Sequence, residues 1–345
     1  MAVCWPFAIN NRRVFRVRGG FLYPAEVFDL TIEDPSHDAM ADEVVLDLNE
    51  LEGESLDVSM LGLPPLERYE VDELVGEGAM GRIFRARDHV LQREVALKVM
   101  RPDIPICERK RFRREAILGA RLLHPGLVQI YDMGMSSEVD DEWFAMELLH
   151  GVDFQQVVDS VREQGRWIAW STIKQGFRRV LAVMQYLHES GVVHRDVKPA
   201  NMFLTRDPNT NYTSTKLLDL GVALDLEDPW TTQALCGDPN YMAPEQTEFN
   251  ARVDHRSDIY SAGMSLYELV TGHLPFAGLC TAPLNALLAA QREAEPPRPS
   301  TLMPQGTPQI RAQAVDTWIA HACAKDPDSR FQNVAEMAEA FERIP

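Results

Sequence analysis

The sequence contains few cysteines and no long apolar run. Its 345 residues include five cysteines, which are scattered, odd in number and without C-x-x-C spacing. This pattern fits neither a disulfide framework nor a zinc site, so reduced intracellular thiols are the simplest interpretation. No stretch approaches the ~18 consecutive apolar residues of a membrane helix, so we expect no membrane segment in this chain.

The amino terminus lacks the features of a secretory signal. Its sequence is M-A-V-C-W-P-F-A-I-N, with no basic region before a short apolar part that Pro6 interrupts. A signal peptide needs both features, and we therefore expect a cytoplasmic protein.

Positive charge is also scarce. The chain has 34 Lys and Arg against 52 Asp and Glu, which gives a net charge of −18, and residues 21–67 hold thirteen acids without one Lys or Arg. A negative surface disfavours binding to phosphate backbones, so we expect no nucleic-acid partner. In this stretch aliphatics alternate with acids and no structural period persists. We expect residues 1–67 to form an acidic extension that is mostly disordered or docks on a partner.

After Pro64-Pro65 the pattern changes to regular elements. Strand-like runs come first, with one basic helix at 108–123 among them, and helical periodicity takes over after residue 151. Strands are expected at Tyr69–Val75, Arg82–Arg87, Glu94–Met100, Leu127–Met133 and Trp143–Leu149. A buried helix face is expected from Ile173 to Leu187, and an apolar helix at Ser257–Thr271 that ends at Gly272. The order predicts a small sheet-based lobe at 68–150 and a larger helical lobe at 151–345.

A glycine motif lies between the first two of these strands. It is Gly76-Glu77-Gly78-Ala79-Met80-Gly81, with Ile83 after it. Glycines allow the backbone to close over a polyphosphate where any Cβ would intrude. The same spacing occurs in dinucleotide sites and ordinary turns, but a dinucleotide site needs a helix directly afterwards, and Arg82–Arg87 has a strand pattern.

A lysine lies in the third strand pattern, Val95-Ala96-Leu97-Lys98. It is either an edge lysine in solvent or a cation directed at the α- and β-phosphates. In the second case a carboxylate must hold the lysine, and Glu115 on the following helix is the candidate. The alternative is that Glu115 is only a surface acid in a charged turn.

The motif His194-Arg195-Asp196-Val197-Lys198-Pro199-Ala200-Asn201 concentrates polar chemistry in eight residues. Here the chain resembles the protein kinase superfamily, and the bacterial eukaryotic-like serine/threonine kinases in particular. The resemblance covers about residues 68–345, and Leu220 in place of phenylalanine is a mild departure from it. Further matching motifs are Asp219-Leu220-Gly221, Ala243-Pro244-Glu245, Ser257–Gly263 and Asp326–Phe331.

The resemblance implies an α+β, bilobal kinase fold, with an antiparallel sheet and one main helix in the small lobe. ATP is then expected in the cleft between the lobes, with a hinge near Glu147–His150 and Met146 at the gatekeeper position. Lys98, paired with Glu115, is expected to hold the α- and β-phosphates. The residues expected to bind ATP are Gly76, Glu77, Gly78, Gly81, Ile83, Ala96, Lys98, Met146, Glu147, Leu149 and Asp219.

The resemblance also implies the catalytic roles. Asp196 is expected to accept or orient the proton of the substrate hydroxyl, and Lys198 to compensate charge on the γ-phosphate. Asn201 and Asp219 are expected to hold Mg²⁺, a hard cation that prefers oxygen ligands. Lys198, two residues after the catalytic aspartate, is typical of serine/threonine kinases, so the expected substrates are Ser and Thr hydroxyls of proteins.

Two other functions remain open. Small-molecule phosphotransferases share the His-x-Asp-x₄-Asn core but lack the Ala-Pro-Glu and Ser-Asp-Ile-Tyr motifs. The stronger alternative is a pseudokinase that binds ATP or partners without turnover. One departure favours it, because relatives have Gly-Thr-Pro where this chain has Gly237-Asp238-Pro239. An acid thus replaces a hydroxyl that is expected to contact Asp196 and Lys198.

Two regulatory expectations concern the activation segment and the extension. Arg195 precedes the catalytic aspartate, an arrangement in which relatives use an activation-segment phosphate, and Thr231 and Thr232 are the expected autophosphorylation sites. Residues 42–57 combine acids with aliphatics, whereas residues 108–114 hold five cations and one acid. Charge complementarity predicts that 42–57 dock on the small lobe beside the helix that carries Glu115. The alternative is a solvated linker or a docking site for another protein.

Overall fold

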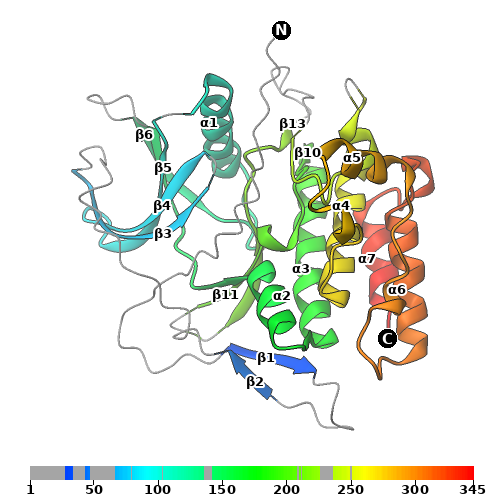
Figure 1. Cartoon of the computed structure of the whole chain (residues 1–345). Coiled ribbons are helices and arrows are strands. Elements are labelled where there is room, and N and C mark those ends of the chain that lie inside the picture. The colour runs from blue at the N-terminus through cyan, green and yellow to red at the C-terminus, as the bar shows by residue number, and fades with distance from the viewer. Residues whose placement is uncertain are drawn as a thin grey trace.

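The computed structural model describes residues 28–33, 43–46, 67–78, 80–102, 104–135, 142–207, 210, 212–225, 236–248 and 251–345. Two lobes lie side by side, a sheet with one helix and a larger body of helices (Figure 1). The bilobal architecture expected from the sequence is therefore confirmed.

The small lobe is an antiparallel sheet in the strand order β3-β4-β5-β7-β6. The strands are β3 (Tyr69–Glu77), β4 (Gly81–Asp88), β5 (Arg93–Met100), β6 (Ile130–Met135) and β7 (Glu142–Met146). These are the five strands that the sequence predicts, with ends that differ by a few residues.

The two faces of β5 pack against different partners because side chains alternate along a strand. Val95, Leu97 and Val99 belong to a cluster with residues of β3 and β4. Met100 on the opposite face packs with Phe112 of helix α1 (Ile106–Arg121). Lys98 shares that second face, which directs it toward α1 and the interior between the lobes.

The large lobe is built around helices and three small strand groups. The helices are α2 (Phe154–Glu163), α3 (Trp170–Glu189), α4 (Arg256–Thr271), α5 (Leu284–Glu293), α6 (Gln309–Ala322) and α7 (Val334–Glu342). The strands are β8 (Gly151–Asp153), β9 (Trp167–Ile168), β10 (Val192–Val193), β11 (Met202–Arg206), β12 (Thr213–Leu217) and β13 (Leu224–Asp225). β12, β11 and β8 form one antiparallel sheet, and β10 pairs with β13.

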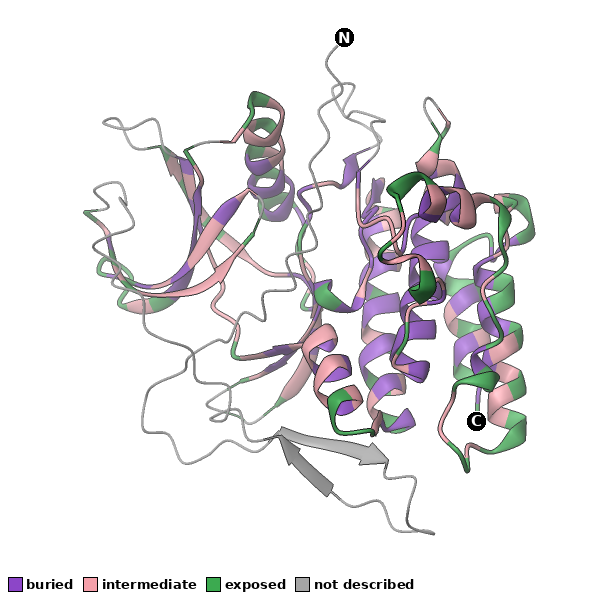
Figure 2. Ribbon diagram, viewed as in Figure 1, coloured by how far each residue is buried: buried purple, intermediate pink, exposed green. Residues whose placement is uncertain are grey.

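Helix α4 is the centre of the large lobe and is buried along nearly its whole length (Figure 2). It packs against α3 and α6. Its end agrees with the sequence prediction, because Gly272 has a left-handed backbone with φ of 70° and its N–H bonds to the carbonyl of Glu268. Among the described residues, no helix has the length and apolar character needed to cross a membrane.

The acidic extension contains two strands that the sequence did not predict. β1 (Phe28–Glu33) pairs with β2 (Glu43–Leu46), and β1 also pairs with β9, with Ile32 opposite Ile168. The hairpin therefore lies at the large lobe (Figure 1). The expectation of disorder is wrong for these strands, and docking on the small lobe is wrong for Glu43–Leu46. Asp42 and 47–57 lie outside the described residues.

Candidate active site

The loop between β10 and β11 presents the predicted catalytic residues, and a buried carboxylate in α4 fixes its backbone. Asp258 accepts hydrogen bonds from the main-chain N–H groups of His194 at 2.8 Å and Arg195 at 2.7 Å. Burial acts to raise the pKa of Asp258, but hydrogen bonding and charge from His188, together with His194, hold that pKa below its ordinary value. The ionised carboxylate thus supports Arg195 in a left-handed conformation with φ of 64°.

Asp196, Lys198 and Asn201 form one hydrogen-bonded cluster. Lys198 Nζ lies 2.9 Å from Asp196 Oδ2. Asn201 Nδ2 donates to the same oxygen at 2.9 Å and to the Asp196 carbonyl at 2.8 Å. Burial acts to lower the pKa of Lys198. The negative charges of Asp196 and Asp238 outweigh burial and raise that pKa, which keeps this lysine charged. The cluster holds a carboxylate and an ammonium where phosphoryl transfer needs both.

Lys98 and Glu115 form a buried ion pair, as the sequence predicts. Lys98 Nζ lies 2.6 and 2.8 Å from the two carboxylate oxygens of Glu115. Burial acts to lower the pKa of Lys98, but Glu115 and Asp219 outweigh it and raise that pKa. Burial also raises the pKa of Glu115 to about 7, against the attraction of Lys98. The pair joins β5 to α1, so α1 must be in this position for Lys98 to be held.

Asp219 lies beside this pair, after β12. Its φ is 63°, and its Oδ1 accepts a hydrogen bond of 2.8 Å from the N–H of Gly221. A Cβ on Gly221 would lie 3.0 Å from Asp219 Oδ1 and 3.2 Å from Glu115 Oε2, so glycine permits this close approach. Desolvation by the surrounding protein acts to raise the pKa of Asp219, although the residue is partly open to solvent, but Lys98 and the Gly221 N–H lower that pKa overall, which keeps a carboxylate here.

The residues predicted to hold a divalent cation have suitable atoms. Because Asn201 uses Nδ2 toward Asp196, its Oδ1 is the side-chain atom left to coordinate. Asp219 contributes carboxylate oxygens. An amide oxygen with carboxylate oxygens is the ligand chemistry that Mg²⁺ prefers, so the donor set fits the expected metal.

The glycine motif and the hinge border the proposed nucleotide site. A Cβ on Gly81 would lie 2.7 Å from the Val99 carbonyl, so a side chain there would force the loop away from β5. The N–H of Gly78 bonds to the Gly81 carbonyl at 2.8 Å. Strand register places Gly76 opposite Ile83 and Ile83 opposite Lys98.

Register also joins the lysine strand to the hinge. Ala96 lies opposite Met146 across β5 and β7. The main-chain N–H of Glu147 donates to the Gln129 carbonyl at 2.9 Å, which fixes the backbone at the start of the expected hinge. The strand register thus places Gly76, Ile83, Lys98, Ala96 and Met146 at neighbouring positions of one sheet.

Asp238 lies where the sequence analysis places it, next to Asp196 and Lys198. Its N–H donates to Asp196 Oδ1 at 2.8 Å, and its Oδ2 lies 3.6 Å from Lys198 Nζ. Its Oδ1 accepts from Asn240 N and Nδ2, each at 3.0 Å. The carboxylate therefore divides its contacts between the loop that follows it and the catalytic lysine.

Sequence reasoning missed the role of Asp258 and the ion pair between Lys216 and Glu147. The signal for Asp258 was present, since an acid in the apolar helix Ser257–Thr271 needs buried partners. Arg330, in the motif Asp326–Phe331, binds both carboxylate oxygens of Glu245 at 2.8 Å and so links that motif to Ala243-Pro244-Glu245. Thr231 and Thr232 lie outside the described residues.

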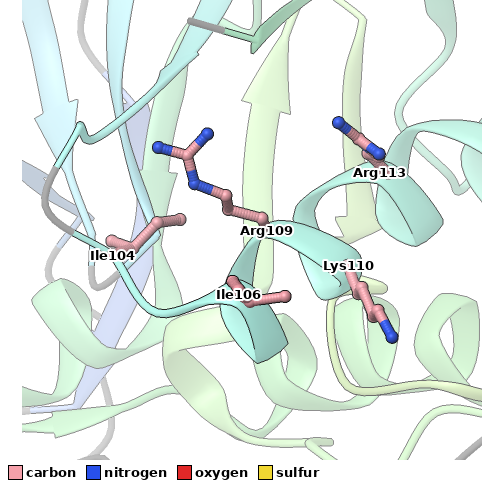
Figure 3. A pocket seen from close by; sticks show the side chains of 5 residues that line it. All are labelled: Ile104, Ile106, Arg109, Lys110 and Arg113. Atoms are coloured by element: carbon pink, nitrogen blue, oxygen red, sulfur yellow. The ribbon is translucent and has the colours of Figure 1, made fainter. Parts of the chain in front are cut away.

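One further concave surface lies at the start of α1, with a volume of about 520 Å³ (Figure 3). Two isoleucines and three cations line it: Ile104, Ile106, Arg109, Lys110 and Arg113. None of them belongs to the set expected to bind ATP, so this surface is separate from the active site.

Comparison with known proteins agrees with this geometry. The family model for the protein kinase domain matches residues 69–341. A probable serine/threonine-protein kinase of Corynebacterium efficiens is 38% identical, over 81% of this chain and 41% of its own length. The serine/threonine-protein kinase PknB of Mycolicibacterium smegmatis is 34% identical, over 81% of this chain and 43% of its own length.

A solved structure shows the same architecture. The PknI kinase domain of Mycobacterium tuberculosis superposes with a TM-score of 0.61 at 26% identity, over 80% of this chain and 94% of that one. Fold and site define a two-lobed protein with the architecture of a protein kinase domain. The chain belongs to the protein kinase family, on the branch of bacterial-type serine/threonine kinases. It spans about two fifths of the length of the curated relatives named above.

Proposed function

We propose that this chain transfers the γ-phosphoryl group of ATP to Ser and Thr hydroxyls of proteins. The observation that carries the proposal is the cluster in which Asp196 Oδ2 lies 2.9 Å from both Lys198 Nζ and Asn201 Nδ2. A complete cluster argues against the pseudokinase alternative, because a scaffold has no need of these three groups in contact. Lys198 is the residue that favours Ser and Thr over Tyr.

In this proposal each residue has a separate task. Asp196 accepts or orients the proton of the incoming hydroxyl, and Lys198 compensates charge on the transferred group. Lys98, held by Glu115, binds the α- and β-phosphates. Asn201 and Asp219 would hold Mg²⁺, which supplies further charge compensation when it is bound.

The direct test is the chemical identity of the product. The protein is incubated with radiolabelled ATP and Mg²⁺ and a generic protein substrate, and the labelled amino acids are then separated. We expect phosphoserine and phosphothreonine. Label on tyrosine alone, or label only on a small-molecule acceptor, would overturn the assignment of the substrate class.

Autophosphorylation of Thr231 or Thr232 is a second part of the proposal. Arg195 is buried, and burial together with Arg111 and Arg114 lowers its pKa, so positive charge is concentrated beside the activation segment. A phosphate would relieve this repulsion. Mass spectrometry of ATP-treated protein should find one of the two threonines modified, and their absence among modified sites would refute this part.

We also propose a cytoplasmic location, supported by the thiols of Cys107, Cys236 and Cys323, for which the described part of the chain offers no disulfide partner. The proposed partners are proteins and not nucleic acids, as the net charge of −18 suggests.

For residues 47–57, docking on the small lobe stays a proposal. The surface in Figure 3 has the cations and isoleucines that an acidic, aliphatic segment needs. A truncated variant that starts at Leu66 should show faster amide hydrogen exchange in 108–123 than the full chain at low salt. Equal exchange in both proteins would remove the docking proposal.

A further inference from the structure

A half-buried lysine outside the predicted site joins three segments at the boundary between the lobes. Lys216 lies on β12, and its side chain is 11% exposed. Its Nζ lies 2.9 Å from Glu147 Oε2 in the hinge and donates to the Leu127 carbonyl at 3.0 Å. The carbonyl belongs to the connection between α1 and β6. The Lys216 ammonium, whose side chain has few rotamers open to it here, therefore binds both the hinge and the connection between α1 and β6.

Backbone hydrogen bonds surround this lysine and make the contact specific. Glu147 and Gln129 bond twice: the Gln129 N–H donates to Glu147 Oε2 at 3.3 Å, and the Glu147 N–H donates to the Gln129 carbonyl at 2.9 Å. Leu217 N donates to the Gly126 carbonyl at 2.8 Å. We call Gly126, Leu127, Gln129, Glu147 and Lys216 the hinge junction.

The hinge junction continues into the active site through three residues. Leu218 N donates to the Asn201 carbonyl at 2.8 Å, and the Leu218 carbonyl contacts His194 Nε2 at 3.0 Å. Asp219 follows directly. Residues 216–219 thus form a short segment. Lys216 at its start is bonded to the hinge, and Asp219 at its end is the carboxylate expected to hold the metal. A shift of the hinge must therefore move or strain residues 216–219.

We propose that Lys216 is a positioning residue that holds the hinge in the geometry that binds ATP. The inference rests on the proposed kinase function and names a residue that acts through Glu147 without contacting the nucleotide. The hinge junction is formed in the same conformation in which Lys98 pairs with Glu115 at 2.6 Å. It therefore belongs to the arrangement in which the phosphate-binding lysine is also in place. Loss of the Lys216 ammonium releases the hinge and weakens nucleotide binding more than the chemical step.

The test compares Lys216→Met with Lys216→Arg. Methionine keeps an unbranched side chain without the charge, and arginine restores a donor for Glu147. We expect Lys216→Met to raise both KM for ATP and Kd for a fluorescent ATP analogue by about tenfold, the loss of one charge-assisted hydrogen bond. We expect kcat to change less than about threefold, and Lys216→Arg to recover most of the affinity.

Lys174→Met is the matched control. Lys174 Nζ also donates to main-chain carbonyls, those of Glu342 at 3.1 Å and Ile344 at 2.5 Å, but these contacts join α3 to the carboxyl-terminal end of the chain. We expect this variant to leave Kd for the analogue unchanged. An equal loss of affinity in both variants would show a general effect of removing a lysine and would overturn the inference.

Glu147→Gln and the double variant separate a specific contact from a general loss of stability. If Lys216 acts through Glu147, the second substitution causes no further loss of affinity. The double variant then binds the analogue no more weakly than whichever single variant has the higher Kd. Additive losses, or an unchanged Kd in Lys216→Met, overturn the inference. Analogue binding requires no turnover, so the test of Lys216 does not depend on phosphate transfer. A wild-type protein that binds the analogue but transfers no phosphate would refute the proposed function, and the binding data would still decide the role of Lys216.

Discussion

Lys98 and Lys198 supply much of the positive charge that the active site offers to a polyphosphate, and each is already held by carboxylates. Lys98 pairs with Glu115, and Lys198 lies 2.9 Å from Asp196 and 3.6 Å from Asp238. Carboxylates fix the direction of an ammonium but also compete with phosphate for it. The balance between orientation and competition differs at the two lysines, because Lys198 has a second carboxylate, Asp238, beside it.

Asp238→Thr should therefore raise the turnover number. Removal of the second carboxylate frees Lys198 for the γ-phosphate, while Asp196 keeps its bonds to Lys198 and Asn201. We expect kcat to rise about threefold, which corresponds to ~0.7 kcal/mol of barrier, with little change in KM for ATP. Steady-state kinetics measure both constants. Asp238→Asn is the control for charge alone, and equal or lower kcat in the threonine variant would show that Asp238 is harmless or compensated.

The pKa of Glu115 near 7 predicts a pH dependence of activity. As pH falls through about 7, a proton neutralises Glu115 and weakens its hold on Lys98, so kcat/KM for ATP should decline. Glu115→Gln should lower activity at all pH values and remove this step from the profile. A wild-type profile that is flat between about pH 6 and 8 would contradict the assignment.

Stability should respond to Glu115 in the opposite direction. Its folded pKa is raised above the ordinary value of 4.5, so the fold favours the neutral carboxyl. This contribution is complete below the ordinary pKa and is lost as pH rises through about 7. Acid therefore lowers activity through this group without unfolding the protein through it, and thermal unfolding measured beside activity separates the two effects.

At the scale of elements, α4 requires a small residue where it meets the end of α6. A Cβ added to Gly263 would lie 2.6 Å from Cys323 Sγ and 2.9 Å from Ala322 Cβ. Gly263→Ala should lower the free energy of unfolding, because overpacking costs ~1–3 kcal/mol and outweighs the ~1 kcal/mol that alanine gains in a helix. Urea unfolding measures the difference.

Gly278→Ala is the control for this prediction. Gly278 lies in the short 3-10 helix Ala277–Leu279, and a Cβ there would meet nothing within 4 Å. We expect a change within ~0.5 kcal/mol. A Gly263→Ala variant as stable as this control would show that α4 and α6 separate at little cost.

The elements also show what the sequence could predict. Period and turn residues located β3, β4, β5, α1 and α4, because their patterns are local. The acids and aliphatics of 21–67 indicated no regular structure, yet β1 forms where β9 offers it an edge. Asp258 binds partners that lie 63 to 70 residues away in the sequence, and Lys216 binds Glu147, 69 residues away. No local pattern reveals contacts over such separations. The contact between Asp196, Lys198 and Asn201 was predictable because their motif is compact.

At the scale of the whole molecule, the two lobes bring together the groups of the proposed phosphoryl-transfer site. The small lobe contributes the glycine motif and the pair of Lys98 with Glu115, and the large lobe contributes Asp196, Lys198 and Asn201. The central claim is that this site turns ATP over, in contrast to a scaffold that only binds it. Asp196 is the residue that distinguishes the two, because nucleotide binding does not need it and transfer does.

The most direct test therefore measures phosphate transfer from radiolabelled ATP by the wild type and by Asp196→Ala, with nucleotide binding measured on the same samples. We predict that both proteins bind ATP with similar affinity and that only the wild type incorporates label, with a loss of at least about 100-fold in the variant. Similar incorporation by both proteins, or tight binding of ATP by the wild type without any transfer, would contradict the account.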